Sequence, residues 1–500
     1  MFKKILLITA LILSACSSVK DQPLPVTTSS DKALEFFNSA VRHWEHGEPD
    51  EARANFQSAL RVDPNFVMAN LWGWSEDPVQ TRKYREVAVS NKDKVSEAEK
   101  LLVEMWEAGR DGNTTKQMEF AKELVNKYPN SSDSYVELGN MYKNETKLDG
   151  AIENYNKALK LNPDNYQAYA QLAQLHVVTG NNIMLPKERQ SRQKAVEYAE
   201  EMIRIRPLSP FAHQIRANIE RQNSNFEEGN KLYQKMIDVC NETGSTAKGR
   251  ALLVSAHNLM FSGKFDQSMN RYDEAVAISE TPNQAFQRRL YQVVAHLFEN
   301  KYYEALDQLD EMAKTVNETS TSQERVNLNT ATLYWHKLMI QSHNQQKAEA
   351  FKSLAQWKKY RKLDLDNDNQ RDVDGYNANN YAMEAWLNTL FGNYDKSKSL
   401  LAKHYAIANN WESAGALDNY NAQMGMVYMM QGNPIKALEY FNERIIPANY
   451  QYFSYFKALA LKATQKNKEA SEIFEFISNY NFLSWEVGLT RNLAKKELDS

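Results

Sequence analysis

A recurring spacing of small and aromatic residues constrains this chain more than any other feature of its sequence. In the clearest copy, Gly139 and Ala151 stand on two successive helical stretches, Tyr155 follows Ala151 by one helical turn, and Pro163 closes the unit. Units of about 34 residues with this pattern are helix pairs that cannot bury their apolar faces alone and must stack on one another. The pattern therefore predicts an all-α chain of stacked helix pairs.

The repeated positions have direct packing roles. Small residues at 139 and 151 let two antiparallel helices approach closely, and Tyr155 fills the space beside them. Pro163 lacks an amide hydrogen and disfavours helix in the residue before it, so it ends the second helix. Gly425 has the place of Gly139 in a later copy. We expect both glycines to lie where paired helices touch.

The unit that ends at Pro163 resembles the tetratricopeptide repeat, with Tyr135 in place of the first aromatic residue of that signature. Further copies are marked by Ala52, Phe56, Ala59 and Pro64, by Met424, Gly425, Tyr428, Ala437 and Phe441, and by Ala458, Leu461, Ala470 and Phe474. The resemblance covers nearly all of residues 33–480. It implies an α-α superhelical solenoid whose concave groove binds segments of other proteins.

The repeats suggest a division of the chain into a leader, a linker, two arrays and a final helix. The expected parts are a signal peptide (1–15), a flexible tether (16–32), an N-terminal array (33–207), a partly degenerate C-terminal array (208–480) and a capping helix (481–500). Two departures interrupt the first array. Residues 72–95 form an irregular segment that fits no repeat, and residues 181–191 form an insertion.

The N-terminus has the features of a bacterial lipoprotein signal. Lys3 and Lys4 precede an apolar stretch that is too short to span a bilayer. Leu13-Ser14-Ala15-Cys16 then resembles a lipobox, which implies that Cys16 carries acyl chains such as palmitate after cleavage. Ser17 follows in place of the Asp that retains enteric lipoproteins in the inner membrane, which favours the outer membrane. The alternative is an ordinary cleaved signal peptide.

Few side chains suggest other chemistry. The net charge of −3 gives no electrostatic basis for binding nucleic acid, and only Cys16 and Cys240 could form a disulfide. His43 and His46 lie three residues apart without a zinc signature. The acidic run from Asp364 to Asp374 lacks the glycine and glutamate of a calcium loop, and we expect it to be a solvated loop. We therefore expect no enzyme activity, no cofactor and no metal.

By the geometry of the family, several side chains of the late repeats face the concave groove, together with two from an early one. The candidate partner-binding residues are Trp386, Met426, Met429, Met430, Tyr452, Tyr455, Asn140 and Lys143. Methionine adapts to varied apolar partners, which suits such a surface. The alternative is that the late residues pack between neighbouring helices. A carboxylate clamp of the kind found in the family is not expected, because Val136 stands where its lysine belongs.

Two functions are consistent with these features. The first is an adaptor of the bacterial envelope that is anchored in the membrane and binds other proteins. The second is an accessory lipoprotein that binds a small ligand or glycan, with residues 181–191 and the acidic run shaping its site.

The lipobox makes a direct prediction. Changing Cys16 to Ser removes the thiol that is acylated, so the variant should accumulate as an unprocessed precursor without labelled fatty acid. Metabolic labelling and a shift in electrophoretic mobility measure both effects. Incorporation of fatty acid into the variant at the level of the unchanged protein would contradict the lipobox.

Overall fold

The computed structural model describes residues 20–177, 183–363, 365, 369–444 and 451–499. Within these ranges the regular structure is helical and contains no strand. We call α1 to α10 the first turn of the superhelix and α11 to α25 the second turn. The expected signal peptide (1–15) and Cys16 lie outside the described residues.

The helices follow one another with short connections. The first turn comprises α1 (Asp31–His46), α2 (Pro49–Val62), α3 (Val67–Trp72), α4 (Pro78–Asn91), α5 (Glu97–Arg110), α6 (Thr114–Lys127), α7 (Ser132–Asn144), α8 (Leu148–Leu161), α9 (Tyr166–His176) and α10 (Arg192–Ile205). The second turn comprises α11 (Pro210–Gln222), α12 (Phe226–Thr243), α13 (Lys248–Phe261), α14 (Phe265–Ala277), α15 (Pro282–Phe298), α16 (Tyr302–Lys314), α17 (Gln323–His343), α18 (Lys347–Leu363), α19 (Gln370–Leu390), α20 (Tyr394–Ala408), α21 (Asp418–Met430), α22 (Pro434–Asn442), α23 (Gln451–Ala463), α24 (Asn467–Ser478) and α25 (Trp485–Leu498). Short 3-10 segments lie at Lys92–Lys94, Lys187–Arg189 and Val316–Glu318.

Successive helices from α1 to α24 pack as pairs, so the all-α solenoid expected from the repeats is the architecture of the described chain. The turn inside most pairs uses a left-handed residue. Gly47, Gly112, Gly263, Gly392 and Gly432 occupy it in five pairs, with φ between 74° and 81°. In five other pairs, which include the clear copy formed by α7 and α8, the same conformation is adopted by Thr146, Ser224, Asn300, Gln345 and Gln465. A left-handed residue suits the end of a helix because it redirects the chain while the last carbonyls remain bonded. The left-handed turn therefore does not require glycine, even in the clearest copy of the repeat.

Paired helices touch at the predicted glycines. A Cβ atom placed on Gly139 would lie 2.5 Å from Cε1 of Tyr155, and one on Gly425 would lie 2.7 Å from Cε1 of Phe441. Tyr155 is fully buried, and its hydroxyl donates to Oδ1 of Asn140 at 2.9 Å. The expectation that these two glycines lie at close helix crossings is confirmed.

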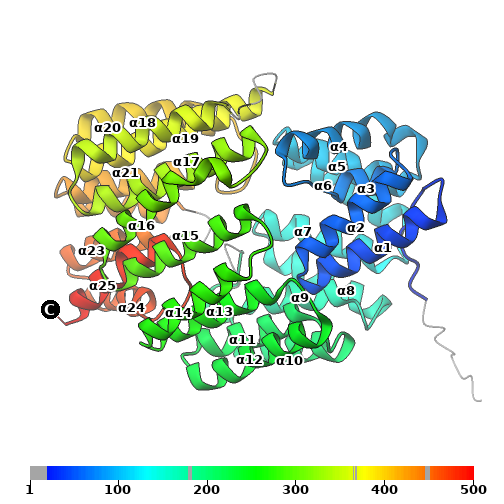
Figure 1. The fold of residues 1–500 in the computed structure, drawn as a ribbon. Coiled ribbons are helices and arrows are strands. Elements are labelled where there is room, and N and C mark those ends of the chain that lie inside the picture. The colour runs from blue at the N-terminus through cyan, green and yellow to red at the C-terminus, as the bar shows by residue number, and fades with distance from the viewer. Residues whose placement is uncertain (1–19, 178–182, 364, 366–368, 445–450, 500) are drawn as a thin grey trace, which may run out of the picture.

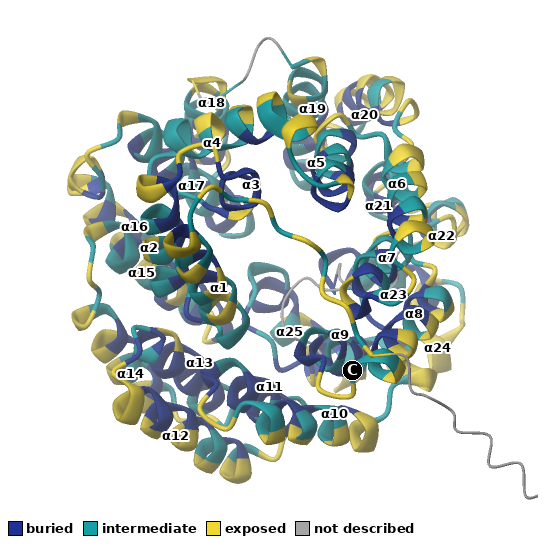
Figure 2. Ribbon diagram, turned by 90° about the vertical axis from the view of Figure 1, so that its right-hand side faces the viewer, coloured by how far each residue is buried: buried dark blue, intermediate teal, exposed yellow. Residues whose placement is uncertain are grey.

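The chain coils so that its second turn lies against its first (Figure 1). The two turns meet along one edge of each. Residues at the starts of α2 and α4 in the first turn contact the connections that lead into α13, α15 and α17 in the second turn. Glu51 accepts from the backbone N–H of Thr246 at 2.7 Å, and Asp77 accepts from Ser322 Oγ at 2.9 Å. Arg82 donates to Glu324 at 2.9 Å. Viewed from the N-terminal end, the helices form a ring around a common axis (Figure 2).

Three parts of the chain differ from, or add to, the sequence-based expectations. The irregular segment expected at 72–95 contains a regular helix, α4, which pairs with the short α3. In the insertion, the described residues fold back, and the Leu185 N–H donates to the Leu175 carbonyl at 2.9 Å. The final helix expected at 485–498 is α25, and it packs against α15 and α23 as well as against α24. Among the described residues, no helix has the length and apolar character that crossing a membrane requires.

The crossing at Gly139 can be tested with a matched pair of substitutions. Gly139→Ala should destabilise the protein by about 1–3 kcal/mol, because the new methyl group overlaps the buried ring of Tyr155. Gly375 lies in α19 with no atom near its Cβ position, so Gly375→Ala should stabilise by about 0.5–1 kcal/mol through helix propensity. Chemical denaturation measures both. Equal effects at the two positions would contradict the close crossing.

Candidate protein-binding site

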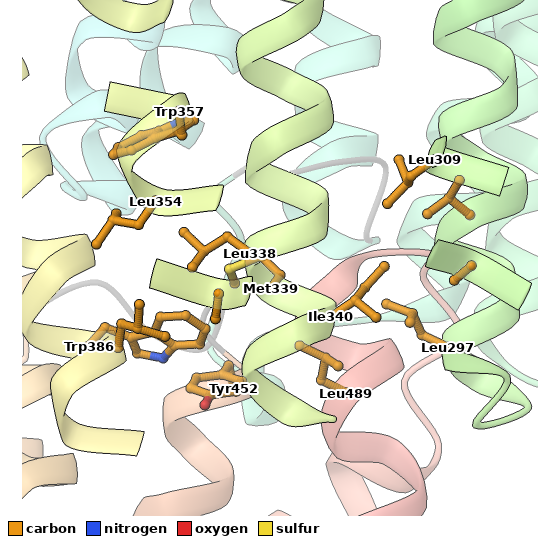
Figure 3. Packing of buried hydrophobic residues seen from close by; sticks show 14 of the residues in the cluster. Leu297, Leu309, Leu338, Met339, Ile340, Leu354, Trp357, Trp386, Tyr452 and Leu489 are labelled. Carbon is orange, nitrogen blue, oxygen red and sulfur yellow. The ribbon is translucent and has the colours of Figure 1, made fainter. Parts of the chain in front are cut away.

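Most of the apolar patch predicted in the late repeats is buried. Trp386, Met426, Tyr452 and Tyr455 are 3%, 0%, 1% and 8% exposed, and the first three belong to one core cluster. Figure 3 shows Trp386 and Tyr452 beside Leu338 and Met339 of α17, with Leu489 of α25 nearby. The prediction of an open groove surface is therefore wrong for these four residues.

The cause lies in the curvature of the second turn. The first helices of its pairs pack directly on one another, α19 against α21 and α21 against α23. Trp485 of α25 then contacts both Tyr452 and Trp335, with ring centroids 5.6 Å and 5.4 Å apart. Residues that line the groove in a more open superhelix therefore become core here, and α25 covers them.

Met429 and Met430 remain half-buried at the edge of this core, and they border a cavity of about 400 Å³. Its lining comes from the ends of α17, α19 and α21 and from α23 and α25. The lining residues are Ser342, His343, Gln345, Leu390, Met429, Met430, Tyr452, Tyr455, Phe456, Leu459, Thr490 and Leu493. We call this space the methionine cavity. The structure thus brings four of the six predicted late residues together around one cavity.

Polar groups of the methionine cavity are largely bonded within the chain. His343 Nδ1 lies 2.9 Å from the Met339 carbonyl and its Nε2 lies 3.1 Å from the Tyr452 hydroxyl. Burial lowers the pKa of His343 to about 4, which keeps the imidazole neutral. Ser342 and Thr490 donate to backbone carbonyls of their own helices. A cavity whose polar groups are already paired favours an apolar occupant.

The two early candidates, Asn140 and Lys143, are half-buried on α7 and are engaged by their own chain. Asn140 accepts from Tyr155, and the Lys143 ammonium donates to Oε1 of Gln171 at 2.6 Å. Burial lowers the pKa of Lys143. These contacts join α7 to α8 and α9, and nothing in them reserves either side chain for a partner.

Two acids of α7, Asp133 and Glu137, have raised pKa values. Burial, and then the charges of Asp21 and Glu45, raise the pKa of Asp133 to about 6. Burial, followed by the charge of Asp133, raises the pKa of Glu137 to about 7, and a hydrogen bond from Asn140 opposes the rise. As whole residues, Asp133 is exposed and Glu137 is half-buried. Two neighbouring acids whose pKa values are raised are a property of α7 that the repeat signature does not predict.

The segment that the sequence predicts to be a flexible tether is attached to the helix array in the structure. Residues 21–29 are extended along the connections that lead into α3, α5, α7 and α9, which lie at residues 63–66, 92–96, 128–131 and 162–165. We call this row of connections the N-terminal rim. In Figure 2 the segment crosses the near end of the ring. The tether prediction is wrong for the described residues from 20 to 32.

Hydrogen bonds fix this segment at three places. Asp21 accepts from the backbone N–H of Ser132 at 2.7 Å, at the start of α7. The Thr27 N–H and hydroxyl donate to the two carboxylate oxygens of Glu99 at 2.9 and 2.6 Å. The Ser29 N–H donates to Asp63 at 2.9 Å.

Apolar contacts add to this attachment, because Leu24 and Val26 pack against the core of the first pairs. Thr28 is half-buried as well, while the residues between these three are exposed. The alternation of inward residues at 24, 26 and 28 is the sequence signal that could have revealed the attachment.

Metal binding finds no support in the described part of the chain, where no three His, Cys, Asp or Glu side chains come together in a suitable cluster. His43 Nδ1 lies 2.7 Å from the carboxylate of Glu48, which explains its place at the end of α1. The first part of the acidic run, at residues 364 and 366–368, lies outside the described residues. Asn369 caps α19, and Asp372 and Asp374 lie within its first turns, so the expectation of a loop is wrong for these two acids.

Comparison with known proteins supports the repeat. A family model described as a TPR repeat matches residues 129–180, which contain α7, α8 and α9. The chain is 23% identical to the mitochondrial import receptor subunit TOM70 of Mus musculus over 251 residues, which are 48% of this chain and 35% of that protein. It is also 23% identical to TOM70 of Homo sapiens over 150 residues, 29% of this chain and 23% of that protein.

The matched region thus spans about a third or less of the length of these relatives. A solved tetratricopeptide repeat protein from Parabacteroides merdae aligns at 18% identity with a TM-score of 0.36, covering 54% of this chain and 94% of that chain. With the helix pairs described above, the family match identifies an all-α array of TPR-like repeats.

The burial of Met426 leads to a stability prediction. Met426→Asp places a carboxylate in a core without a partner, so it should destabilise the second turn by several kcal/mol. Met430→Gln, at the half-buried edge of the cavity, should cost about 1 kcal/mol. Thermal unfolding followed by circular dichroism compares the two. An unchanged melting temperature for Met426→Asp would contradict the burial of Met426 and favour an open groove at this position.

Proposed function

We propose that this protein is an adaptor of the bacterial cell envelope, anchored by lipid at Cys16, that binds other proteins through the methionine cavity. The observation that carries the binding role is the cavity itself. It is mostly apolar, most of its polar groups are bonded within the chain, and two flexible thioethers stand at its edge. Methionine side chains adapt to differently shaped partners, and aromatic walls give large contact area.

The size of the cavity limits its occupant. About 400 Å³ is near the lower end of the range, roughly 300–1,000 Å³, that proteins use for small ligands. A whole helix does not fit into such a space, but one or two apolar side chains of a partner do. We therefore propose that a partner protein inserts an apolar anchor residue between Met430 of α21 and Leu493 of α25.

The membrane anchor rests on the sequence pattern that ends at Cys16, which lies outside the described residues. The curated relatives are named as subunits of an import receptor, and a receptor role for this chain is compatible with a protein-binding cavity. The outer membrane is the proposed location because Ser17 follows the lipobox.

A second candidate function is binding of a small ligand or glycan, and one observation favours it. The insertion contributes Met184, Lys187 and Gln190 to a cavity of about 370 Å³, whose opposite wall is formed by Phe476 and Phe482. Aromatic faces beside amide groups suit a sugar. However, many of its polar groups are already engaged, as when Gln190 donates to the Leu185 carbonyl at 2.7 Å, which favours the adaptor function.

The adaptor function is tested with a matched pair of methionines. Met430→Glu puts a charge at the methionine cavity, whereas Met118→Glu puts one at a half-buried position of α6 in the first turn. Proteins captured by the acylated chain from detergent-solubilised envelopes are quantified by mass spectrometry. The captured amount of a protein that binds this cavity should fall at least tenfold for Met430→Glu and stay unchanged for Met118→Glu. The reason is that a few buried contacts supply most of the binding free energy.

Melting temperatures of both variants serve as the control for folding. Equal capture by the two variants would contradict the use of the methionine cavity. Binding of a sugar by the unchanged protein, lost on Phe482→Ala and kept on Met430→Glu, would favour the second candidate function.

A further inference from the structure

The N-terminal rim is placed differently from the equivalent connections of the second turn. In the second turn, acids of the first turn cover the connections that lead into α13 and α17, through Glu51 and Asp77. Among the described residues no helix precedes α1, and residues 21–29 cover the first-turn connections instead. Asp21 supplies α7 with a carboxylate acceptor that its own N-cap residue, Ser131, does not provide. The segment therefore closes this end of the superhelix.

This attachment shortens the link to Cys16. Asp21, the first attached residue, lies only five residues after Cys16 in the sequence. Fully extended, five residues span about 18 Å. A tether that was free up to α1 would instead contain fifteen residues and reach about 50 Å. Attachment at Asp21 thus reduces the possible distance between Cys16 and the folded body by about a factor of three.

We propose that the N-terminal rim is a membrane-facing surface, held against the lipid bilayer by this short link. The proposal rests on the lipid anchor of the proposed function. Exposed Lys94, Lys127 and Lys160 lie on or beside the rim among exposed Asp93 and Asp164. Because these charges nearly balance, the placement follows from the length of the link and not from attraction to anionic headgroups.

The methionine cavity lies at the opposite side of the helix array. It is lined by residues at the C-terminal ends of α17, α19 and α21, whereas the N-terminal rim lies at the start of first-turn helices. In Figure 1, α18 to α21 lie far from the end of the molecule at which the N-terminal segment leaves it. Holding the rim at the bilayer therefore turns the cavity toward the aqueous phase, where a partner protein can reach it.

The orientation is tested on the full acylated protein in vesicles of phosphatidylethanolamine and phosphatidylglycerol. One fluorophore is attached at Lys160→Cys beside the rim, and another at Lys347→Cys at the start of α18. Cys240 is buried and its pKa is raised to about 12 by burial, so it stays unlabelled. Lipids with a nitroxide on the headgroup should quench the fluorophore at position 160 several-fold more than that at position 347.

Release of the segment provides the second arm. Asp21→Ala, Gln22→Pro and Thr27→Pro together remove the attachments at α7 and at Glu99. Alanine lacks the carboxylate that accepts from Ser132, and proline has neither the N–H that bonds Asn130 or Glu99 nor the hydroxyl of Thr27. The difference between the two labels should then largely disappear. Gln22→Ala changes only an exposed side chain of the same segment and keeps the backbone N–H that donates to Asn130, so it should preserve the difference.

Mass spectrometry of Cys16 distinguishes a failure of the proposed orientation from a failure of the proposed lipid anchor. Equal quenching of both labels in an acylated protein overturns the orientation alone. An unacylated Cys16 overturns the anchor and the orientation together.

Discussion

The close crossings of the helix pairs determine how the chain coils, and in the clearest copies a small residue of one helix meets an aromatic ring of the other. At Gly139 and Gly425 the rings of Tyr155 and Phe441 occupy the space that a side chain would need. Each crossing fixes the angle between two helices, and a small rotation per pair accumulates into a superhelix. In this protein the accumulated curvature brings the second turn against the first, so that the array closes on itself and gains contacts far apart in the sequence.

Contacts between turns share one chemical theme. Carboxylates from one layer accept hydrogen bonds at the start of helices in the next, as Glu51 does before α13 and Asp77 does at Ser322 of α17. The first helical N–H groups lack partners within their own helix, and the helix dipole favours negative charge there. Asp21 repeats this arrangement at α7 from the N-terminal segment. The segment therefore takes the place that a preceding turn would have, which explains why a polar stretch with two prolines is held in place.

Features that depend on residues within one repeat could be predicted from the sequence, whereas features that depend on several repeats could not. The helix pairs, the crossings at Gly139 and Gly425 and the left-handed Gly47 follow from signatures inside single repeats. The burial of Met426 does not, because it depends on curvature accumulated over several pairs and on α25 returning to cover them. Attachment of residues 21–29 depends on acceptors as distant in the sequence as Asn130, and only the alternation of Leu24 and Val26 indicates it.

The chain's own N-terminal segment closes the end of the superhelix, and amide hydrogen exchange of the intact protein tests this closure most directly. The N–H groups of Gln22, Thr27 and Ser29 donate to Asn130, Glu99 and Asp63, and exchange of such groups requires local opening. Peptides covering residues 20–30 should exchange far more slowly than the same peptides in an unfolded chain, at a rate approaching that of α1. Exchange at the unfolded rate, with α1 still protected, would show that the segment is not attached.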